Sequence, residues 1–214
     1  MVSLQVNGYH ICGGFLISDQ FVLTAAHCWN RRDFLTVVVG AHDLWNSKCS
    51  YRIGVKSYIP HPYYIGPPNP FRNDIMLLKL KKRVKLNNKV RLISLPKDRN
   101  IKAGTRCIVA GWGRLATNGP VSNRLMEADT TVKSQAECQH RWGSTYLASK
   151  MICAYGCGGS CRGDSGGPLV CGNTAVGITS FGSKQCNSPE HPNVYTKISP
   201  YRRWIHNQML SVYM

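Results

Sequence analysis

Apolar residues recur along this chain mainly in short runs with the two-residue period of β-strands. The runs are rich in β-branched and aromatic residues and are separated by Gly, Pro and Asn turns, a punctuation that is typical of a barrel or a sandwich. The early runs that predict strands are residues 2–7, 14–17, 21–24, 35–40 and 51–60. The pattern therefore predicts an all-β protein.

Two segments depart from the strand pattern and predict helices. Ser134 and Glu137 have the spacing of a capping box, which predicts the start of a short helix. Near the C-terminus, Ser199 and Pro200 fit an N-cap and a first helical position. Apolar residues then recur at roughly helical spacing, namely Ile198, Tyr201, Trp204, Ile205 and Met209. We interpret this C-terminal helix as structural.

The composition limits the cellular compartments and the cofactors that fit this chain. The chain has 214 residues, is 43% hydrophobic and contains ten cysteines, which indicates a sizeable core and structural disulfides in an oxidising compartment. The cysteines do not form a paired CxxC zinc pattern, and no HExxH motif occurs, so we expect no metal and no other cofactor. No apolar run is long enough to span a membrane.

The formal net charge is +17 and the isoelectric point is about 9.7, which favours association with polyanions. The basic residues gather between positions 79 and 106: Lys79, Lys81, Lys82, Arg83, Lys85, Lys89, Arg91, Lys97, Arg99, Lys102 and Arg106. This run is either a solvated face or a docking surface for an acidic proteoglycan or another heparin-like polyanion. Few aromatic residues interrupt it, which argues against specific nucleic-acid binding.

Three separate segments contain candidate catalytic residues. Ser165 lies in the glycine-rich segment 163–168, and glycines permit tight turns that can expose a hydroxyl beside backbone N–H groups. His27 follows two alanines and precedes a cysteine, and Asp74 opens an apolar run. Each segment alone could be a hairpin loop, a half-buried histidine or a strand edge. Together they supply a nucleophile, a base and an acid that orients the base.

The order His27, Asp74, Ser165 is the chymotrypsin order, distinct from the subtilisin and α/β-hydrolase orders. With these segments and the Gly-Trp-Gly turn at 111–113, the chain resembles the chymotrypsin-like (trypsin-fold) serine proteases over nearly its whole length. The resemblance implies two packed antiparallel β-barrels and a C-terminal helix in a single peptidase domain. The implied parts are a first barrel at 1–94, a linker at 95–106, a second barrel at 107–197 and the helix at 198–214.

The resemblance also implies a role for each catalytic candidate. Ser165 is the nucleophile, His27 accepts its proton, and Asp74 holds the imidazole tautomer and stabilises the cation. The backbone N–H groups of Gly163 and Ser165 form the oxyanion hole.

Asp164 has a different role in the family, where it pairs with the ammonium of the mature N-terminus. The segment Met1–Val6 reads as a strand and not as a signal peptide. We therefore expect this chain to be an N-terminally incomplete copy of a secreted protein. Without its ammonium partner Asp164 would be an unpaired buried charge, so we expect the chain by itself to be zymogen-like, with little activity.

The residues that the resemblance assigns to substrate binding are Gly159, Ser160, Ser180, Phe181, Gly182 and Asn193. Trypsin-like relatives have an aspartate at the pocket base, where Gly159 stands here. We therefore predict cleavage after an uncharged residue and not after Lys or Arg, because a substrate cation there would be unpaired. Inward folding of Arg162 or Lys184 would instead favour an acidic residue. Ser180 and Gly182 are expected to pair with the substrate backbone.

The resemblance pairs eight of the ten cysteines in four disulfides: Cys12–Cys28, Cys107–Cys171, Cys138–Cys153 and Cys161–Cys186. Cys49 and Cys157 are left over. The sequence leaves open whether they pair with each other, stay free or bridge two molecules.

Within the family, segments 40–43 and 73–80 and the high basicity look most like the leukocyte granule proteases, which are the granzymes, mast-cell chymases and cathepsin G. This likeness implies a secreted or granule-stored endopeptidase that acts on polypeptides, and we expect a monomer. The alternative is a catalytically silent, cationic binding or antimicrobial protein. Silent relatives usually lose a triad residue, whereas this chain keeps His27, Asp74 and Ser165.

Overall fold

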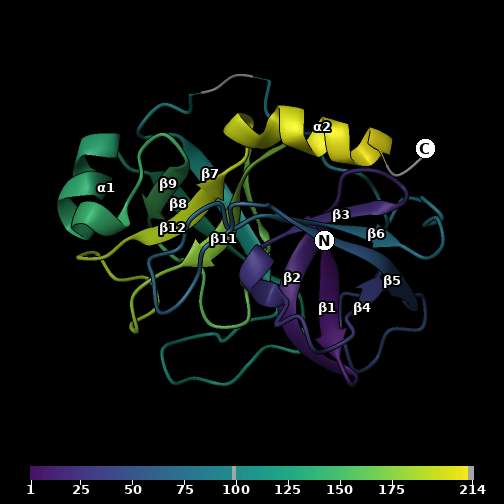
Figure 1. Cartoon of the computed structure of the whole chain (residues 1–214). Helices are drawn as coiled ribbons and strands as arrows, with labels where there is room; N and C mark the ends of the chain where they lie inside the picture. Colours follow the sequence, from purple (N-terminus) through teal and green to yellow (C-terminus); the bar gives the residue numbers. More distant parts are fainter. Residues whose placement is uncertain (98–99, 212–214) are drawn as a thin grey trace.

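The computed structural model describes residues 1–97 and 100–211. Within that range the chain forms two closed antiparallel barrels beside each other (Figure 1). The strand order is β1-β2-β3-β6-β5-β4 in the first barrel and β10-β11-β12-β9-β8-β7 in the second. The prediction of an all-β, two-barrel protein is therefore confirmed, whereas the proposed domain boundaries stay a prediction.

The strands of the first barrel are β1 Val2–Val6, β2 Tyr9–Leu16, β3 Phe21–Thr24, β4 Thr36–Val39, β5 Tyr51–Pro60 and β6 Met76–Leu80. Those of the second are β7 Arg106–Gly111, β8 Met126–Val132, β9 Met151–Tyr155, β10 Pro168–Cys171, β11 Thr174–Phe181 and β12 Asn193–Lys197. The predicted strand 14–17 in fact begins at Tyr9. Asn7 and Gly8 have φ angles of 50° and 85°, so a two-residue turn pairs β2 with β1 along its length.

The helical segments are η1 Ala26–Cys28, α1 Gln135–Trp142, η2 Gly143–Thr145, η3 Ser199–Tyr201 and α2 Arg202–Ser211. The Ser134 side chain accepts from the Glu137 N–H at 3.1 Å, as an N-cap does. The C-terminal helix differs from the prediction because its first turn is 3₁₀, and the α-helix begins only at Arg202. The predicted helical residues 212–214 lie outside the described residues. No described helix has the length and apolarity needed to cross a membrane.

The core of the first barrel is completed by the end of the chain. Its hydrophobic cluster includes Ala175 and Ile178 of β11, and Ile198, Tyr201 and Ile205 from the C-terminal segment. In Figure 1 α2 lies across the top of the molecule. The second barrel instead has two smaller clusters, one around Cys107–Cys171 and one around Cys138–Cys153. Packing of this C-terminal segment into the core of the first barrel therefore holds the two barrels together.

Strand β1 is buried on both faces. Val2 and Leu4 point into the first core, and the alternation of a strand places Ser3 and Gln5 on the opposite face. Ser3 is 0% exposed and Gln5 is 4% exposed, so their polar groups require partners inside the protein. Gln5 Nε2 donates to Ser3 Oγ at 3.1 Å.

Candidate active site

His27 and Asp74 are joined at the edge of the first barrel. His27 lies in η1, and Asp74 comes just before β6. The His27 Nδ1 lies 2.7 Å from Asp74 Oδ2, and the His27 backbone N–H donates to Asp74 Oδ1 at 3.0 Å. The Cys12–Cys28 disulfide anchors η1 to β2. Both the position and the orientation of the imidazole are thereby fixed.

A side chain of the second barrel completes the surroundings of Asp74. Asp74 is 2% exposed, and the Ser180 hydroxyl donates to its Oδ2 at 2.6 Å. Burial lowers the pKa of His27, but the charge of Asp74 and its hydrogen bond outweigh burial, so the net pKa is raised. The sequence assigned Ser180 only to substrate binding. Its bond to Asp74 joins residues 106 positions apart, for which the sequence has no local signal.

Ser165 lies in a turn that two glycines make possible. Gly163 and Gly166 have φ angles of +102° and +81°, a region that residues with a Cβ rarely adopt. The Ser165 carbonyl accepts from the Gly13 N–H at 2.8 Å, which attaches this turn to β2 of the first barrel. The nucleophile candidate is therefore held against the barrel that carries His27.

The Ser165 side chain and His27 line the same cavity of about 440 Å³. In the part of the chain that the structure describes, the Ser165 hydroxyl makes no hydrogen bond to the His27 ring. Catalytic hydrogen bonds are often long in the absence of substrate and tighten in the complex. The structure thus brings His27, Asp74 and Ser165 together. Among the described residues the Ser165 hydroxyl has no hydrogen-bond partner.

The backbone N–H groups of Gly163 and Ser165 also lack protein partners. Neither donates to an acceptor among residues 1–97 and 100–211. Nearly all buried N–H groups in proteins are paired, so two neighbouring free donors beside a serine hydroxyl form a natural site for an anionic oxygen.

Asp164 belongs to the same turn, and two backbone N–H groups hold its carboxylate. Its Oδ1 accepts from the Gly113 N–H and its Oδ2 from the Cys161 N–H, each at 2.8 Å. Burial raises the pKa of Asp164, and these two hydrogen bonds offset part of the effect. Asp164 therefore fixes the position of the Gly-Trp-Gly turn relative to the nucleophile turn. Its expected pairing with an N-terminal ammonium stays a prediction.

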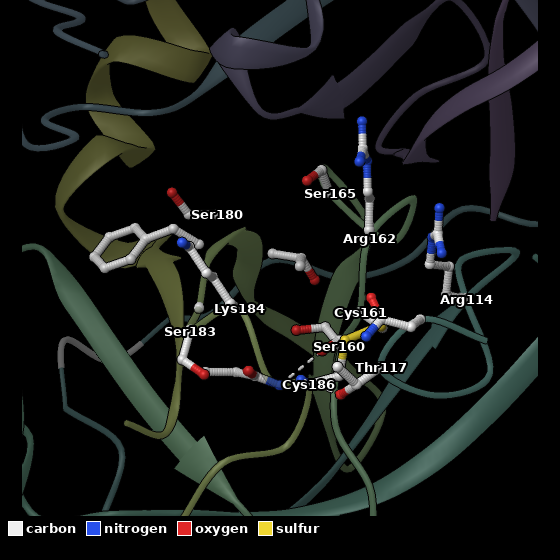
Figure 2. Close-up of a pocket in the computed structure, with 15 residues that line it drawn as sticks. Arg114, Thr117, Ser160, Cys161, Arg162, Ser165, Ser180, Ser183, Lys184 and Cys186 are labelled. Carbon is white, nitrogen blue, oxygen red and sulfur yellow. Dashed lines mark hydrogen bonds between the residues drawn. A yellow bond between two sulfur atoms is a disulfide. The ribbon is translucent and has the colours of Figure 1, made fainter. Parts of the chain in front are cut away.

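A cavity of about 480 Å³ opens beside Ser165 (Figure 2). Five of the six predicted substrate-binding residues line it, namely Ser160, Ser180, Phe181, Gly182 and Asn193. Gly159 does not line this cavity, and its assignment to the base of the substrate pocket stays a prediction. Gly159 lines a neighbouring cavity of about 490 Å³.

The amide of Asn193 separates Gly159 from this cavity. Its Nδ2 donates to the Ser160 carbonyl at 3.1 Å and lies 2.5 Å from where a Cβ on Gly159 would be. Its Oδ1 lies 2.8 Å from the Cβ position of Gly182, on the opposite wall. Asn193 thus spans the pocket and makes its base polar and uncharged.

Three cationic side chains line this cavity: Arg114, Arg162 and Lys184. Arg114 and Arg162 extend side by side on the side of Ser165, as Figure 2 shows. No acidic side chain is present among the residues lining the cavity. The lining therefore offers no counter-charge to a substrate lysine or arginine.

An aromatic wall continues from the catalytic histidine candidate along the cleft. The Phe71 ring lies 5.3 Å from the His27 ring and stacks on Phe181 at 5.6 Å. Trp142 meets Phe181 edge-on at 5.1 Å. The sequence analysis missed Phe71 and Trp142, although Phe71 comes shortly before Asp74 in the chain.

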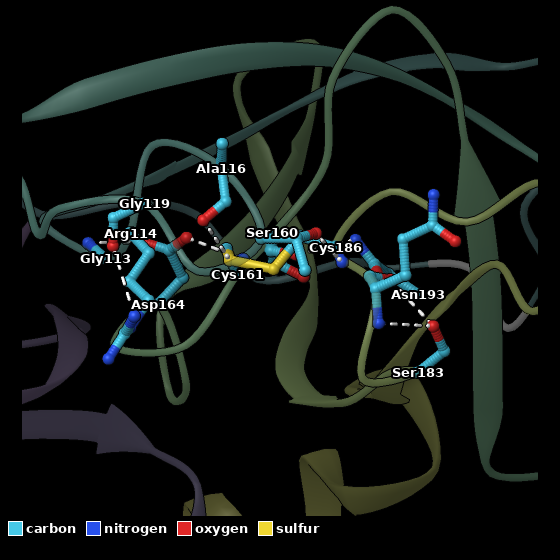
Figure 3. The surroundings of a disulfide bond; sticks show 12 residues. Gly113, Arg114, Ala116, Gly119, Ser160, Cys161, Asp164, Ser183, Cys186 and Asn193 are labelled. Atoms are coloured by element: carbon cyan, nitrogen blue, oxygen red, sulfur yellow. Dashed lines mark hydrogen bonds between the residues drawn. A yellow bond between two sulfur atoms is a disulfide. The ribbon is translucent and has the colours of Figure 1, made fainter.

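All four expected disulfides are present in the structure. Figure 3 shows Cys161–Cys186 beside Ser160 and Asn193, so this bridge supports the pocket. Cys49 and Cys157 are exposed and unbridged. The sulfurs of Cys12 and Cys28 lie near the His27 ring, but in a disulfide they cannot act as thiolate ligands to a metal.

Comparison with known proteins gives one consistent result. The trypsin family model matches residues 1–205. Granzyme B(G,H) of Mus musculus is 45% identical over 94% of this chain and 81% of that protein. Duodenase-1 of Bos taurus is 43% identical over 94% of this chain and 78% of that protein. The solved structure of neuropsin, a serine protease of mouse brain, has a TM-score of 0.91 and 38% identity, covering 97% of this chain and 93% of that one.

Proposed function

Because the chain belongs to the trypsin family and is a serine-type endopeptidase, we propose that it cleaves polypeptides with His27, Asp74 and Ser165 as its catalytic triad. The assignment of the triad depends on one observation. Asp74 holds His27 through two hydrogen bonds, in a cavity that His27 shares with Ser165.

The proposed reaction follows from these positions and from the chemistry for which this family is the reference case. The Ser165 hydroxyl attacks the substrate carbonyl while the free Nε2 of His27 takes its proton, and Asp74 stabilises the imidazolium that forms. The N–H groups of Gly163 and Ser165 bind the oxyanion. His27 then gives the proton to the leaving amine, and an acyl-enzyme remains. Water, activated in turn by His27, hydrolyses the acyl-enzyme.

We further propose that the residue before the cleaved bond is uncharged. A substrate ammonium beside the Asn193 amide would be buried without a counter-charge, which is strongly unfavourable. Ser160 and Asn193 offer hydrogen bonds at the base, which suits a side chain with a polar or polarisable tip. A positional peptide library decides this preference. Dominant cleavage after Lys or Arg would contradict the proposal, and dominant cleavage after Asp would mean that Arg162 or Lys184 turns inward.

The decisive test of the triad is Ser165→Ala in the matured full-length protein. Peptidase activity is expected to disappear while the fold remains, since only one half-buried hydroxyl is removed. A fluorophosphonate should label the unmodified protein at Ser165 and leave the variant unlabelled. Labelling that persists in Ser165→Ala would overturn the assignment. A folded wild-type protein that is neither labelled nor active would favour the alternative of a silent cationic protein.

We also propose that the protein is secreted or stored in granules with an acidic proteoglycan or similar polyanion. Two features support this proposal: the charge of +17 and the likeness to relatives named granzyme and mast cell protease. Within the basic run, Lys79 is only 5% exposed and Arg83 pairs with Asp19 at 2.8 Å. The docking surface would therefore be formed by the other members of the run that the structure describes as exposed, namely Lys81, Lys82, Lys85, Lys89, Arg91, Lys97, Lys102 and Arg106.

Heparin affinity chromatography tests this partner. Replacement of Lys81, Lys82 and Lys85 by Gln should lower the salt concentration of elution, because fewer counterions are released on binding. Equal loss of charge at Lys56, Arg141 and Arg203, which are exposed outside the run, is the matched control. Unchanged elution of the first variant would place the polyanion elsewhere.

A further inference from the structure

Three cysteines line the same cavity of the second barrel. They are Cys157, Cys161 and Cys186, and the cavity has a volume of about 490 Å³. Cys161 and Cys186 form a disulfide, whereas Cys157 is exposed and unbridged. A free thiol and a disulfide bond therefore border the same open space.

Backbone contacts hold Cys157 in a segment next to that of Cys186. Asn187, which follows Cys186, donates from its Nδ2 to the carbonyl of Gly156, which precedes Cys157, at 3.1 Å. On the other side of Cys157, the Gly158 N–H donates to a carbonyl of β8 at 3.0 Å. Both neighbours of Cys157 are thus fixed in place. Of the two bridged sulfurs, that of Cys186 belongs to the segment that contacts the neighbours of Cys157.

On this basis we propose that the Cys157 thiol exchanges with the Cys161–Cys186 disulfide, so that the protein interconverts between two disulfide isomers. The first isomer has the Cys161–Cys186 bridge and a free Cys157. The second has a Cys157–Cys186 bridge and a free Cys161. The exchange itself is independent of the proposed function, whereas its effect on the substrate pocket rests on that function.

The exchange needs no external oxidant. A thiolate breaks a disulfide by attacking one of its sulfurs, and the other sulfur leaves as a thiolate. Cys157 first loses its proton to solvent, and its thiolate forms a bond to the Sγ of Cys186. The bond between Cys186 and Cys161 breaks, and Cys161 leaves as a thiolate that takes a proton from solvent. One disulfide and one thiol are present before and after, so no net oxidation or reduction occurs.

The bridge that is exchanged joins two parts of the substrate pocket. Cys161 follows Ser160, whose carbonyl accepts from the Asn193 amide at the base of the pocket. Cys186 ends a segment whose residues Gly182, Ser183 and Lys184 also line the pocket. The bridge in the first isomer therefore attaches this wall of the pocket to its base.

The second isomer attaches the same wall elsewhere. Residues 157–159 line the neighbouring cavity of about 490 Å³ and not the substrate pocket. A Cys157–Cys186 bridge would therefore leave the wall without its covalent link to the pocket base. Because the triad is not part of this link, we expect the second isomer to bind substrate more weakly while the chemical step changes little.

Sequential alkylation tests the exchange without any activity measurement. The folded protein is incubated for increasing times and quenched in acid. Its free thiols are then labelled with N-ethylmaleimide, and its disulfides are reduced and labelled with iodoacetamide. Trypsin releases residues 151–162, which contain Cys153, Cys157 and Cys161, and tandem mass spectrometry identifies the label on each. Cys153, bridged to Cys138, should carry only the second label.

We expect the first label to be shared between Cys157 and Cys161. The matched control is Cys49→Ser, which removes the other exposed free cysteine and should leave this distribution unchanged. A first label on Cys157 alone, at every incubation time, would overturn the inference. A first label on Cys186 would overturn it as well, because Cys157 would then bridge Cys161.

The variant Cys161→Ser should trap the second isomer. In an oxidising buffer its Cys157 and Cys186 should form a disulfide, and KM should be about 10-fold higher than in Cys157→Ser, which keeps the first bridge, with kcat nearly equal. Free thiols at both Cys157 and Cys186 in a folded Cys161→Ser protein would overturn the inference. Equal KM values in the two bridged variants would overturn the proposed effect on the pocket.

Failure of the proposed triad gives a different result. It would abolish fluorophosphonate labelling of Ser165 in every variant, while the alkylation pattern would still report on the exchange. Failure of the exchange would leave the labelling of Ser165 intact.

Discussion

The two walls of the active-site cleft differ in how far their polar groups are satisfied. On the first-barrel wall Asp74 receives the His27 ring, the His27 N–H and the Ser180 hydroxyl. On the second-barrel wall the Ser165 hydroxyl is unengaged, and two N–H groups are free within the described residues. The first wall is thus complete before substrate arrives. The second offers the hydrogen bonds that only a reacting carbonyl can complete.

This difference assigns distinct tasks to the two walls. A base must keep one tautomer and one orientation through the reaction, so its supports are made in advance. Donors for a developing charge contribute most when they are fixed but unoccupied. Unsatisfied groups are rare elsewhere in folded proteins, and here they lie beside the serine. Substitutions that affect the base or the donors should therefore lower kcat, whereas changes in the substrate pocket beside them should act mainly on KM.

The largest expected effect is on the first wall. Asp74→Asn should lower kcat by about 10⁴-fold, as in the reference members of the family, because the amide no longer holds the reactive tautomer of His27. KM should change little, since the amide oxygen of the asparagine can still accept from the Ser180 hydroxyl, which lines the pocket. Steady-state kinetics checks this, with the exposed Asp129→Asn as control. A loss of less than 10-fold would mean that Asp74 does not orient the base.

Two disulfides, one on each wall of the cleft, provide a second test of the difference between the walls. Cys12–Cys28 and Cys161–Cys186 span 16 and 25 residues, so loop entropy alone makes their stabilisation differ by only about 0.4 kcal/mol. Replacing either pair with alanine should cost about 2–4 kcal/mol of unfolding free energy. The first replacement should lower kcat by displacing His27, and the second should raise KM by loosening the pocket. Denaturant titrations and kinetics on both variants test this, and identical kinetic changes would contradict it.

The variant Asn193→Ala should change which side chains the substrate pocket accepts. Removing the amide that spans the pocket exposes the Gly159 side, so kcat/KM for a large aromatic residue should rise about 10-fold relative to a small one. Asn118→Ala, which alters another residue lining the same cavity, is the matched control. A peptide series that varies only the residue before the cleaved bond gives the ratio. An unchanged ratio of the two kcat/KM values would show that Asn193 does not limit the depth of the substrate pocket.

The smallest effect concerns pH. Asp74 raises the pKa of His27 above its ordinary value of 6.5, and the reaction needs the neutral ring. kcat/KM should therefore fall about 10-fold per pH unit below that raised pKa. Stability runs in the opposite sense, since protonation of His27 favours the folded state, and this contribution is lost as pH rises through the folded pKa. In Asp74→Asn the kinetic midpoint should move to lower pH. If the midpoint of the pH profile of kcat/KM does not move, Asp74 is not the cause of the raised His27 pKa.

The parts that could be predicted from the sequence are those that local patterns encode. Alternation predicted five of the six strands of the first barrel, and the segments around His27, Asp74 and Ser165 were recognisable because a catalytic group needs particular neighbours. The rest depends on contacts made only when the barrels dock. Nothing adjacent to Ser180 indicates its bond to Asp74. The separation of Gly159 from the pocket by Asn193 likewise depends on where β12 places that amide.

Packing of the C-terminal segment into the first core has a consequence for biosynthesis. The segments that carry His27 and Asp74 are synthesised before Ile198, Tyr201 and Ile205, which complete the core beneath them. A chain translated only through the first barrel therefore has an unfinished core and lacks Ser165. A competent peptidase can form only after the C-terminal segment has been made, so a chain abandoned before that point is not an active protease.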